Sequence, residues 1–270
     1  MLLDIDYHPY QGRVARKNAY LTFLPSPALS HWVQSFWQLN VPEGKFYYRS
    51  VPDNSVDLII NLNCPEETFI VTPFSSSIVF ELEGPVSYFG IRFRILGHQG
   101  LIPTPLGEWS AADDDTKTAE VLPDHVLHAI YECMGKPLQF GSRCKFLTTL
   151  LLSTVQYPDI DPRLACYIRY CSQNISSNIS LSDKQCSEFG LSARQLRRLT
   201  QLYLGLSPRE FARVLRFQNT LQAMNTASNK SAWADHYYDQ PHFIREFKNL
   251  SGLTPTEFKS LSVLYNSESS

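Results

Sequence analysis

The sequence contains no long hydrophobic run. Its longest apolar cluster, around residues 146 to 155, is far shorter than the roughly 20 residues that a helix needs to span a bilayer. Residues 1 to 6 include neither a basic stretch nor a long apolar one, so we expect no signal peptide. These absences argue against a membrane partner and lead us to expect a soluble, cytoplasmic protein.

Metal-binding and catalytic motifs are also missing. No Cys-x-x-Cys pair occurs among the cysteines, which are Cys64, Cys133, Cys144, Cys166, Cys171 and Cys186. They indicate reduced, mostly buried thiols. No His-x-His occurs, and His125 and His128 with Cys133 lack the spacing of a zinc site. Without a nucleophile elbow, a phosphate loop or a dinucleotide fingerprint, we expect no metal, no cofactor and no enzyme.

The charge of the chain is small in total but unevenly divided. Residues 1 to 162 carry 11 Lys and Arg against 18 Asp and Glu, a net charge of −7. The remainder carries 13 against 8, a net charge of +5. An acidic and a basic half are expected when one of two domains meets phosphate.

The basic half contains an internal repeat. Residues 190 to 211 return as residues 237 to 258, with every matched position shifted by 47. Self-similarity at a fixed offset indicates a duplicated supersecondary unit. The matched pairs are Ser192 with Asp239, Leu196 with Phe243, Arg198 with Arg245, Gly205 with Gly252, and Glu210 with Glu257.

The repeated positions predict the same helices in both units. Ser192 and Asp239 are suited to cap a helix, and Gly205 and Gly252 to end it in a left-handed conformation. A Ser-Pro or Thr-Pro pair with a glutamate then restarts the chain at residues 207 to 210 and 254 to 257. Each capped helix has one apolar face and one cationic face.

Each capped helix follows another short helical segment, at residues 181 to 189 and 231 to 237. Two helices joined by a tight turn, the second one cationic, are typical of a helix-turn-helix unit, whose second helix enters the major groove of DNA. A long helix at residues 208 to 224 joins the two units, with Phe211, Val214, Leu215, Leu221 and Met224 facing inward. Ordinary helical hairpins with solvated arginines are the alternative, and the duplication argues against it.

Residues 160 to 260 resemble the DNA-binding domain of the AraC/XylS family of bacterial transcription regulators. The family's second unit commonly reads close to Asp-Gln-Ser-His-Phe-Ser-Arg-x-Phe-Lys, and residues 239 to 248 read Asp-Gln-Pro-His-Phe-Ile-Arg-Glu-Phe-Lys. His236 stands where the family usually has glycine, and Pro241 replaces a polar residue. The resemblance implies DNA contacts at Arg194, Gln195, Arg197, Arg198, His242 and Arg245, with Gln240 and Lys248 near phosphates.

The acidic half has the pattern of short strands separated by turn residues. The expected strands are residues 33–39, 46–51, 56–62, 68–72, 78–82 and 86–95, with turns that include residues 42–44 and 83–85. Such spacing favours an antiparallel barrel or sandwich. With the family resemblance, we expect a cupin-like barrel. Residues 52–59 and 90–93 also look like a sensor domain that is often fused to these regulators.

Residues 88 to 95 alternate in polarity. Tyr88, Arg92 and Arg94 lie on one face, opposite Phe89 and Ile95. If the arginine face lines the barrel, it is suited to hold an anionic small molecule by charge-assisted hydrogen bonds. If it faces water, it is an ordinary polar surface. Both alternatives stay open.

Two helices are expected between the barrel and the basic half, at residues 119–134 and 142–156. The second carries an apolar stripe of Phe146, Leu147, Leu150, Leu151 and Val155, which packs either on the barrel or on a second subunit. Residues 157 to 162 then break the helical pattern, so we place a boundary there between domains 1–157 and 158–270. Asp161 is suited to cap the next helix, which Pro162 opens.

Taken together, the predicted fold is α+β, with an N-terminal antiparallel β-barrel and helices followed by an all-α domain of two helix-turn-helix units. The predicted function is sequence-specific regulation of transcription, with double-stranded DNA as a partner and a small-molecule effector in the barrel. Control of the barrel by a protein partner is the alternative. The family resemblance further implies a homodimer through the N-terminal domain and contact with RNA polymerase, and the roles of activator and repressor both stay open.

Overall fold

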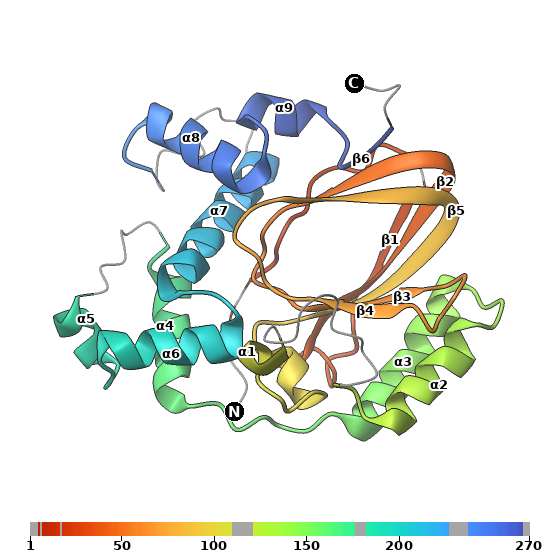
Figure 1. The fold of residues 1–270 in the computed structure, drawn as a ribbon, viewed down its shortest axis with the longest axis horizontal. Coiled ribbons are helices and arrows are strands. Elements are labelled where there is room, and N and C mark those ends of the chain that lie inside the picture. Colours follow the sequence, from red (N-terminus) through yellow and green to blue (C-terminus); the bar gives the residue numbers. More distant parts are fainter. Residues whose placement is uncertain are drawn as a thin grey trace.

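The computed structural model describes residues 5, 7–16, 18–109, 121–175, 182–226 and 237–266. A curled antiparallel sheet lies beside a group of helices formed by the second half of the chain (Figure 1). The predicted two-part α+β organisation is confirmed. His236 and nearly all of the predicted helical segment at 231 to 237 lie outside the described residues. In the part of the chain that is described, no helix has the length and apolarity required to cross a bilayer.

The sheet consists of β1 (Tyr20–Phe23), β2 (Val33–Ser50), β3 (Asp57–Asn61), β4 (Thr68–Val71), β5 (Ile78–Phe93) and β6 (Leu264–Tyr265). Its strands are hydrogen-bonded in the order β1-β2-β5-β3-β4, and β6 pairs with β2. All the pairings are antiparallel. β6 is formed by the C-terminal end of the described chain, so both halves of the sequence contribute to one sheet. Neither β1 nor β6 follows from the strand pattern of the sequence.

Strands β2 and β5 correct the prediction of separate short strands. The expected turns at residues 42–44 and 83–85 lie inside these two long strands and opposite each other, because Val41 pairs with Val86 and Gly44 with Gly84. The register shifts between Val41 and Gly44, so the strand bulges there instead of turning. A Cβ on Gly84 would lie 1.8 Å from the Pro42 carbonyl oxygen. Turn-forming residues therefore mark a close approach of two paired strands.

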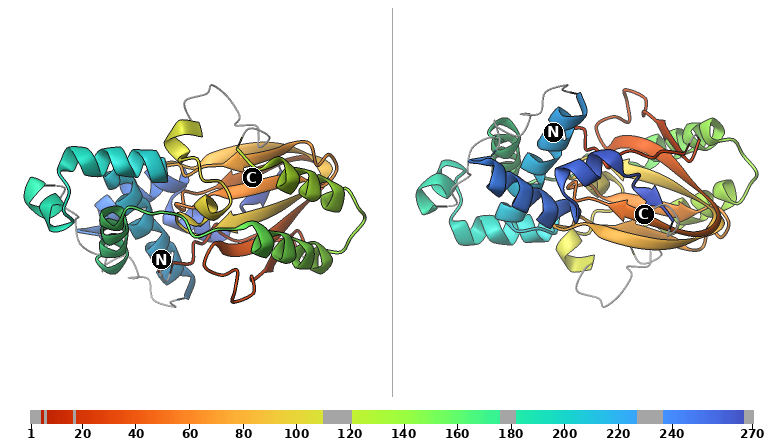
Figure 2. Two further views of the ribbon diagram at one scale, coloured as in Figure 1. Left: turned by 90° about the horizontal axis from the view of Figure 1, so that it is seen from below. Right: turned by 90° about the horizontal axis from the view of Figure 1, so that it is seen from above.

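Helices α2 (Asp124–Met134) and α3 (Phe140–Thr154) pack on one face of the sheet. Phe89, Ile91 and Phe93 of β5 are fully buried in this core. Figure 2 shows α2 and α3 at the opposite end of the molecule from α4, α6 and α8. The helix expected from residue 119 begins at Asp124 in the structure, directly after Pro123, and residues 119 and 120 lie outside the described part.

The apolar stripe of α3 packs mostly inside the chain. Leu147 and Leu151 are fully buried, and Leu150 and Val155 contact the same core. Phe146 is 36% exposed. Of the two alternatives for this stripe, packing on the sheet therefore accounts for four of its five residues.

The helical half contains α4 (Pro162–Gln173), α5 (Asp183–Glu188), α6 (Ala193–Leu204), α7 (Pro208–Thr226), α8 (Gln240–Ser251) and α9 (Pro255–Ser260). A 3-10 helix, η1 (Gly97–Gly100), and the short α1 (Leu106–Trp109) follow β5 in the chain and come before α2. α6 and α8 lie near the two ends of α7 (Figure 1). The buried side chains of α7 include Phe211, Val214, Leu215 and Leu221, and Met224 is partly buried, as predicted.

The predicted caps are confirmed in both units. The Ser192 and Gln195 side chains bond each other's backbone amides in a capping box, and the Asp239 carboxylate accepts from His242 N at 2.8 Å. Gly205 and Gly252 end α6 and α8 with φ of 69° and 75°. The predicted helix starts after the two glycines are also confirmed. Glu210 accepts a hydrogen bond from Ser207 N, and Glu257 accepts one from Thr254 N. Asp161 caps α4, with Pro162 at the first position.

Hydrophobic packing joins the two halves of the chain. Ile5, Tyr7, Ile95 and Leu96 are buried among residues of α4, α6 and α7. Val51, at the end of β2, is buried among residues of α7, α8 and α9. The predicted boundary after residue 157 falls in the segment between α3 and α4 and stays a prediction, since the two halves share parts of their cores.

Candidate nucleic-acid interface and cavity of the sheet

The predicted DNA-contacting side of α6 is exposed. Arg194, Gln195, Arg197 and Arg198 all face solvent. Leu196, Leu199 and Thr200 are buried on the opposite face. The helical period of 3.6 residues places these two sets on opposite sides, so packing leaves the arginines free for a partner.

Gln195 has a second role besides the predicted one. Its side-chain oxygen accepts hydrogen bonds from Ser192 N at 2.9 Å and from Ser192 Oγ at 3.1 Å. That oxygen therefore completes the cap of α6 and fixes the start of the helix.

Helix α8 exposes most of its predicted contact residues. Gln240, Arg245 and Lys248 are exposed, whereas Phe243 and Phe247 are buried. Arg245 thus occupies the same kind of position in α8 as Arg198 in α6.

His242 differs from the other predicted contacts because it is half-buried. Its Nε2 atom lies 3.5 Å from a carboxylate oxygen of Glu246, and its ring stands edge-on to Tyr237 at 5.8 Å between centroids. His242 is therefore held by its own unit to a greater degree than the exposed arginines.

Glu246 is a residue of this site that the sequence reasoning missed. It is 9% exposed and lies on the buried side of α8. One carboxylate oxygen accepts from Arg216 Nη2 of α7 at 2.7 Å, and Arg213 Nε lies 4.0 Å away. This pairing fixes α8 against α7. The sequence contained one signal for this role: Glu246 stands four residues after His242, so the two side chains lie on the same side of the helix.

The first unit is in contact with the N-terminal half through α1. A Cβ on Gly107 would lie 3.0 Å from Leu202 Cα and 3.1 Å from the Gln201 carbonyl oxygen of α6. Because these neighbours are backbone atoms, only glycine allows this approach without a shift. The end of α6 therefore lies directly against the N-terminal half.

The curled sheet encloses a cavity lined mainly by aromatic and aliphatic side chains. Its empty volume is about 730 Å³, counting the opening to solvent. The lining includes Tyr20, Trp37, Tyr48 and Phe80, and at its polar side Asp53, Asp57 and Arg92. Tyr88 and Arg92, two of the three residues predicted for a ligand, line this cavity. The arginine face is expected either to line the barrel or to face water. Arg92 lines the cavity of the sheet.

Arg92 is already paired inside the cavity. Its Nε and Nη2 atoms donate to Asp57 at 2.9 to 3.2 Å, and Nη2 lies 3.3 Å from Asp53. Burial opposes the charge of Arg92, but the two carboxylates raise its pKa well above the usual value. Burial raises the pKa of Asp53, and the charge of Arg92 lowers it. Asp57 also accepts from Trp37 Nε1 at 2.9 Å.

Arg94 does not belong to this cavity, which corrects its grouping with Arg92. β5 ends at Phe93, and Arg94 Nε donates to the Ser30 carbonyl oxygen at 2.5 Å. Its Nη1 atom donates to the Ile5 carbonyl oxygen at 3.2 Å. The strand alternation stops where the strand ends, so Arg94 holds the N-terminal segment instead. Ile95 packs with the helical half for the same reason.

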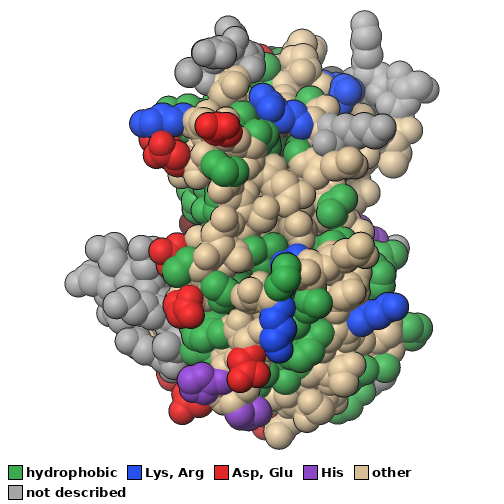
Figure 3. All heavy atoms as spheres, turned by 90° about the vertical axis from the view of Figure 1, so that its right-hand side faces the viewer, with side chains coloured by type: hydrophobic (Ala, Val, Ile, Leu, Met, Phe, Trp, Pro, Cys, Tyr) green, Lys and Arg blue, Asp and Glu red, His purple; other side chains and the backbone are tan. Residues whose placement is uncertain are grey.

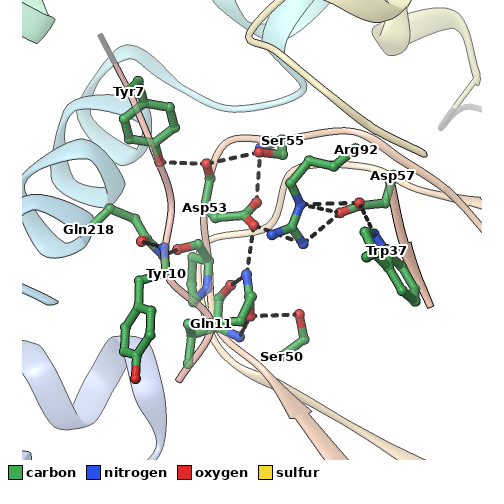
Figure 4. A network of polar contacts seen from close by, with 12 residues as sticks. Tyr7, Tyr10, Gln11, Trp37, Ser50, Asp53, Ser55, Asp57, Arg92 and Gln218 are labelled. Atoms are coloured by element: carbon green, nitrogen blue, oxygen red, sulfur yellow. Dashed lines mark hydrogen bonds and ion pairs between the residues drawn. The ribbon is translucent and has the colours of Figure 1, made fainter. Parts of the chain in front are cut away.

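A network of hydrogen bonds connects the cavity to α7 (Figure 4). Asp53 Oδ2 accepts from Gln11 Nε2 at 2.6 Å, and Tyr7 Oη donates to the Asp53 carbonyl oxygen at 2.5 Å. Next to it, Gln218 Nε2 of α7 donates to the Pro52 carbonyl oxygen at 2.7 Å. Asn54 Nδ2 donates to the Phe211 carbonyl oxygen at 3.1 Å. The loop at residues 52 to 54 thus contacts Arg92 on one side and α7 on the other.

The described residues hold no group of three or more His, Cys, Asp or Glu side chains that is arranged for a metal ion. His125 and His128 are exposed on α2, whereas Cys133 is buried, so the trio weighed from the sequence does not converge.

Known families match both halves of the chain. Residues 185–260 match a helix-turn-helix domain, and residues 21–113 match a domain of unknown function (DUF6597). No curated protein matches the chain.

Among solved structures, the chain is similar to ToxT from Vibrio cholerae. An apo variant from strain SCE256 has a TM-score of 0.43 and 13% identity, over 93% of this chain and 100% of that chain. Wild-type ToxT from the same strain with a bound unsaturated fatty acid has a TM-score of 0.40 and 12% identity, over 92% and 97%. At TM-scores below 0.5, these similarities support no conclusion about this chain.

The family match covers the segment in which the repeated caps, the left-handed glycines and the cationic helices lie. Residues 185–260 therefore belong to the AraC-type helix-turn-helix domains, and the chain is a DNA-binding transcription regulator.

Proposed function

We propose that α6 and α8 read two adjacent major grooves of one DNA duplex, while the cavity of the sheet takes a small-molecule effector. The main support for this proposal is that both helices expose arginine on the side opposite their buried faces. Both helices also pack on the same helix, α7. Adjacent major grooves on one side of a duplex lie roughly 34 Å apart, and a rigid connecting helix suits such a fixed spacing.

The exposed residues divide into two proposed roles. Arg194, Arg197 and Arg198 of α6 and Arg245 of α8 are suited to base edges, because arginine binds guanine with two hydrogen bonds. Gln240 and Lys248 are suited to phosphates, which position the protein without reading sequence. His242 is a weaker candidate for base contact, since Glu246 holds its ring.

Effector control is proposed to pass through residues 52 to 54. Asp53 touches Arg92 in the cavity, and its neighbours Pro52 and Asn54 are bonded to α7. A ligand that shifts Arg92 therefore alters the support of the helix that joins both units. Such a ligand acts only to the extent that it binds two arrangements of this loop with different affinity. Homodimerisation and contact with RNA polymerase stay predictions.

Substitution of one residue from each role tests the proposal. Arg198→Ala is expected to cost about 1–3 kcal/mol on the cognate site and to relax preference at one base position, whereas Lys248→Ala weakens all sequences about equally. Fluorescence anisotropy on a panel of singly substituted sites measures both. Arg169→Ala, an exposed arginine of α4, is the matched control and should change little. Equal effects of Arg198→Ala and Lys248→Ala across the panel would contradict the assigned roles.

A further inference from the structure

We propose that the cavity of the sheet selects an uncharged, largely aromatic or aliphatic ligand with a hydrogen-bond acceptor, and that it discriminates against carboxylates. This inference rests on the proposed function of the cavity as the effector site and names the ligand class. It reverses the expectation of an anionic ligand that follows from the arginines in the sequence of β5.

The cavity carries no net positive charge before any ligand enters. Asp53, Asp57 and Arg92 are the charged residues of its lining, so one guanidinium faces two carboxyl groups. The net charge is −1 with both carboxyl groups ionised and zero with Asp53 protonated. In neither state is it positive, and the cavity therefore has no net attraction for an anion.

An incoming carboxylate also has no free arginine fork to bind. Asp57 already takes the Nε and Nη2 donors of Arg92, and it accepts from Trp37 as well. Binding an anion here means displacing Asp57 from its guanidinium and leaving a buried carboxylate with poorer compensation. Breaking such a buried pair, or burying an unpaired charge, is strongly unfavourable.

The cavity does offer donors to a neutral acceptor. The hydrogen bonds and ion pairs of Arg92 to described residues use Nε and Nη2, which leaves Nη1 for a carbonyl or amide oxygen of a ligand. Burial raises the pKa of Tyr48 to about 12 and raises that of Tyr20 further. Both hydroxyls are thus neutral at physiological pH and serve as donors or acceptors.

The rest of the lining favours rings and alkyl groups. Phe69 of β4, Phe74 of the connection after it, and Phe80 and Leu82 of β5 all line the cavity. Ligand sites of this kind combine an apolar wall with a few placed polar groups. Figure 4 shows Arg92 between Asp53 and Asp57.

A matched pair of probes tests the inference on the full chain. Naphthalene-2-carboxamide and 2-naphthoate have nearly the same shape and differ in charge at pH 7. By isothermal titration calorimetry, the carboxamide should bind the wild-type chain at least about tenfold more tightly than the carboxylate, a difference of about 1.4 kcal/mol. Equal binding, tighter binding of 2-naphthoate, or binding of neither probe at millimolar concentration overturns the inference.

Two variants and one control connect the result to the named residues. Asp57→Asn replaces, at nearly constant shape, the carboxyl group that takes the Nε and Nη2 donors of Arg92, so the preference should shift toward 2-naphthoate by about tenfold. Leu82→Trp adds bulk to the apolar lining of the cavity and should weaken both probes. Glu81→Gln, on the exposed neighbouring position of β5, should change neither. An unchanged preference in a folded Asp57→Asn chain overturns the charge argument.

The DNA-binding assay on the same preparations separates the two proposals. If DNA binding responds to Arg198→Ala as expected while the carboxamide does not bind, the ligand class is wrong and the DNA-binding proposal stands. If both fail in a folded chain, the proposed function itself has failed.

Discussion

His98 in η1 is a buried histidine whose ring nitrogens have no hydrogen-bond partner among the described residues. It is 1% exposed, and neither ring nitrogen has a partner in the part of the chain that the structure describes. Burial lowers its pKa from 6.5 to about 3, so the folded protein keeps the ring neutral against Trp109. The unfolded chain takes up a proton below about pH 6.5. This difference stabilises the folded state above pH 6.5 and is lost as the pH falls toward about 3.

We therefore expect His98→Phe to flatten part of the acid dependence of stability. Between pH 6.5 and about 3, His98 should contribute a slope of up to about 1.4 kcal/mol per pH unit to the free energy of unfolding. Urea unfolding at a series of pH values measures it, and carboxylates titrate in both proteins and cancel. His125→Phe on the exposed face of α2 is the control. Parallel curves for wild type and His98→Phe would show that His98 is not held neutral.

At the scale of elements, β6 ties the end of the helical half to the sheet. Leu264 is 2% exposed and packs among Trp37, Leu39 and Phe46. Arg49 N donates to the Val263 carbonyl oxygen at 2.8 Å, and Val263 N donates to the Arg13 carbonyl oxygen at 2.9 Å. The residues after α9 thus lie between β2 and the segment before β1. β6 therefore also covers part of an otherwise free edge of β2.

Leu264→Ala should accordingly destabilise the protein although it lies near the end of the chain. Removing a fully packed leucine side chain typically costs about 2–5 kcal/mol. Leu261→Ala, three residues earlier and 42% exposed, should stay within about 0.5 kcal/mol. Urea unfolding followed by far-ultraviolet circular dichroism compares the two. Equal stability of both variants would mean that β6 does not contribute to the sheet in solution.

At the scale of the whole molecule, net charge differs between the two halves of the chain. The arginines of α6 and α8 belong to the half with a net charge of +5. Figure 3 shows the face turned away from α5 and α6, where Lys and Arg are scattered among acidic and hydrophobic side chains. This distribution directs phosphate to one part of the surface.

DNA binding by the whole chain is therefore expected to weaken steeply with salt. Each neutralised phosphate releases counterions and adds about 0.9 to the negative slope of log K against log salt. Anisotropy titrations from about 50 to about 200 mM salt measure that slope. Lys248→Ala should reduce it by about 1 if Lys248 contacts phosphate. A slope near zero would rule out the proposed interface.

The helical half could be predicted closely because its signals are local. A cap such as Ser192 with Gln195, or Thr254 with Glu257, involves atoms within four residues of each other. A left-handed glycine needs no distant partner either. The internal repeat then doubled each of these signals. Helix ends, the exposed cationic faces and the inward residues of α7 follow from the sequence for this reason.

The sheet could be predicted only in part, because its decisive contacts are distant in sequence. The proline and glycine residues in segments 42–44 and 83–85 predict a turn in each segment when that segment is considered alone. Paired across β2 and β5, they form a bulge, since the partner strand supplies the hydrogen bonds. β6 has two residues and no strand signal of its own, and only its fit beside β2 makes it a strand.

The sequence by itself determined the capped helices, their cationic faces and the alternation of β5 that turns Arg92 away from Phe89 and Ile91. Only the tertiary structure decided what Arg92 faces. Its partners Asp53 and Asp57 lie 35 residues or more away along the chain, and the fold brings all three into one cavity. The electrostatic effect of a buried charge depends on the charges around it, and the local sequence pattern of a strand does not show which charges those are.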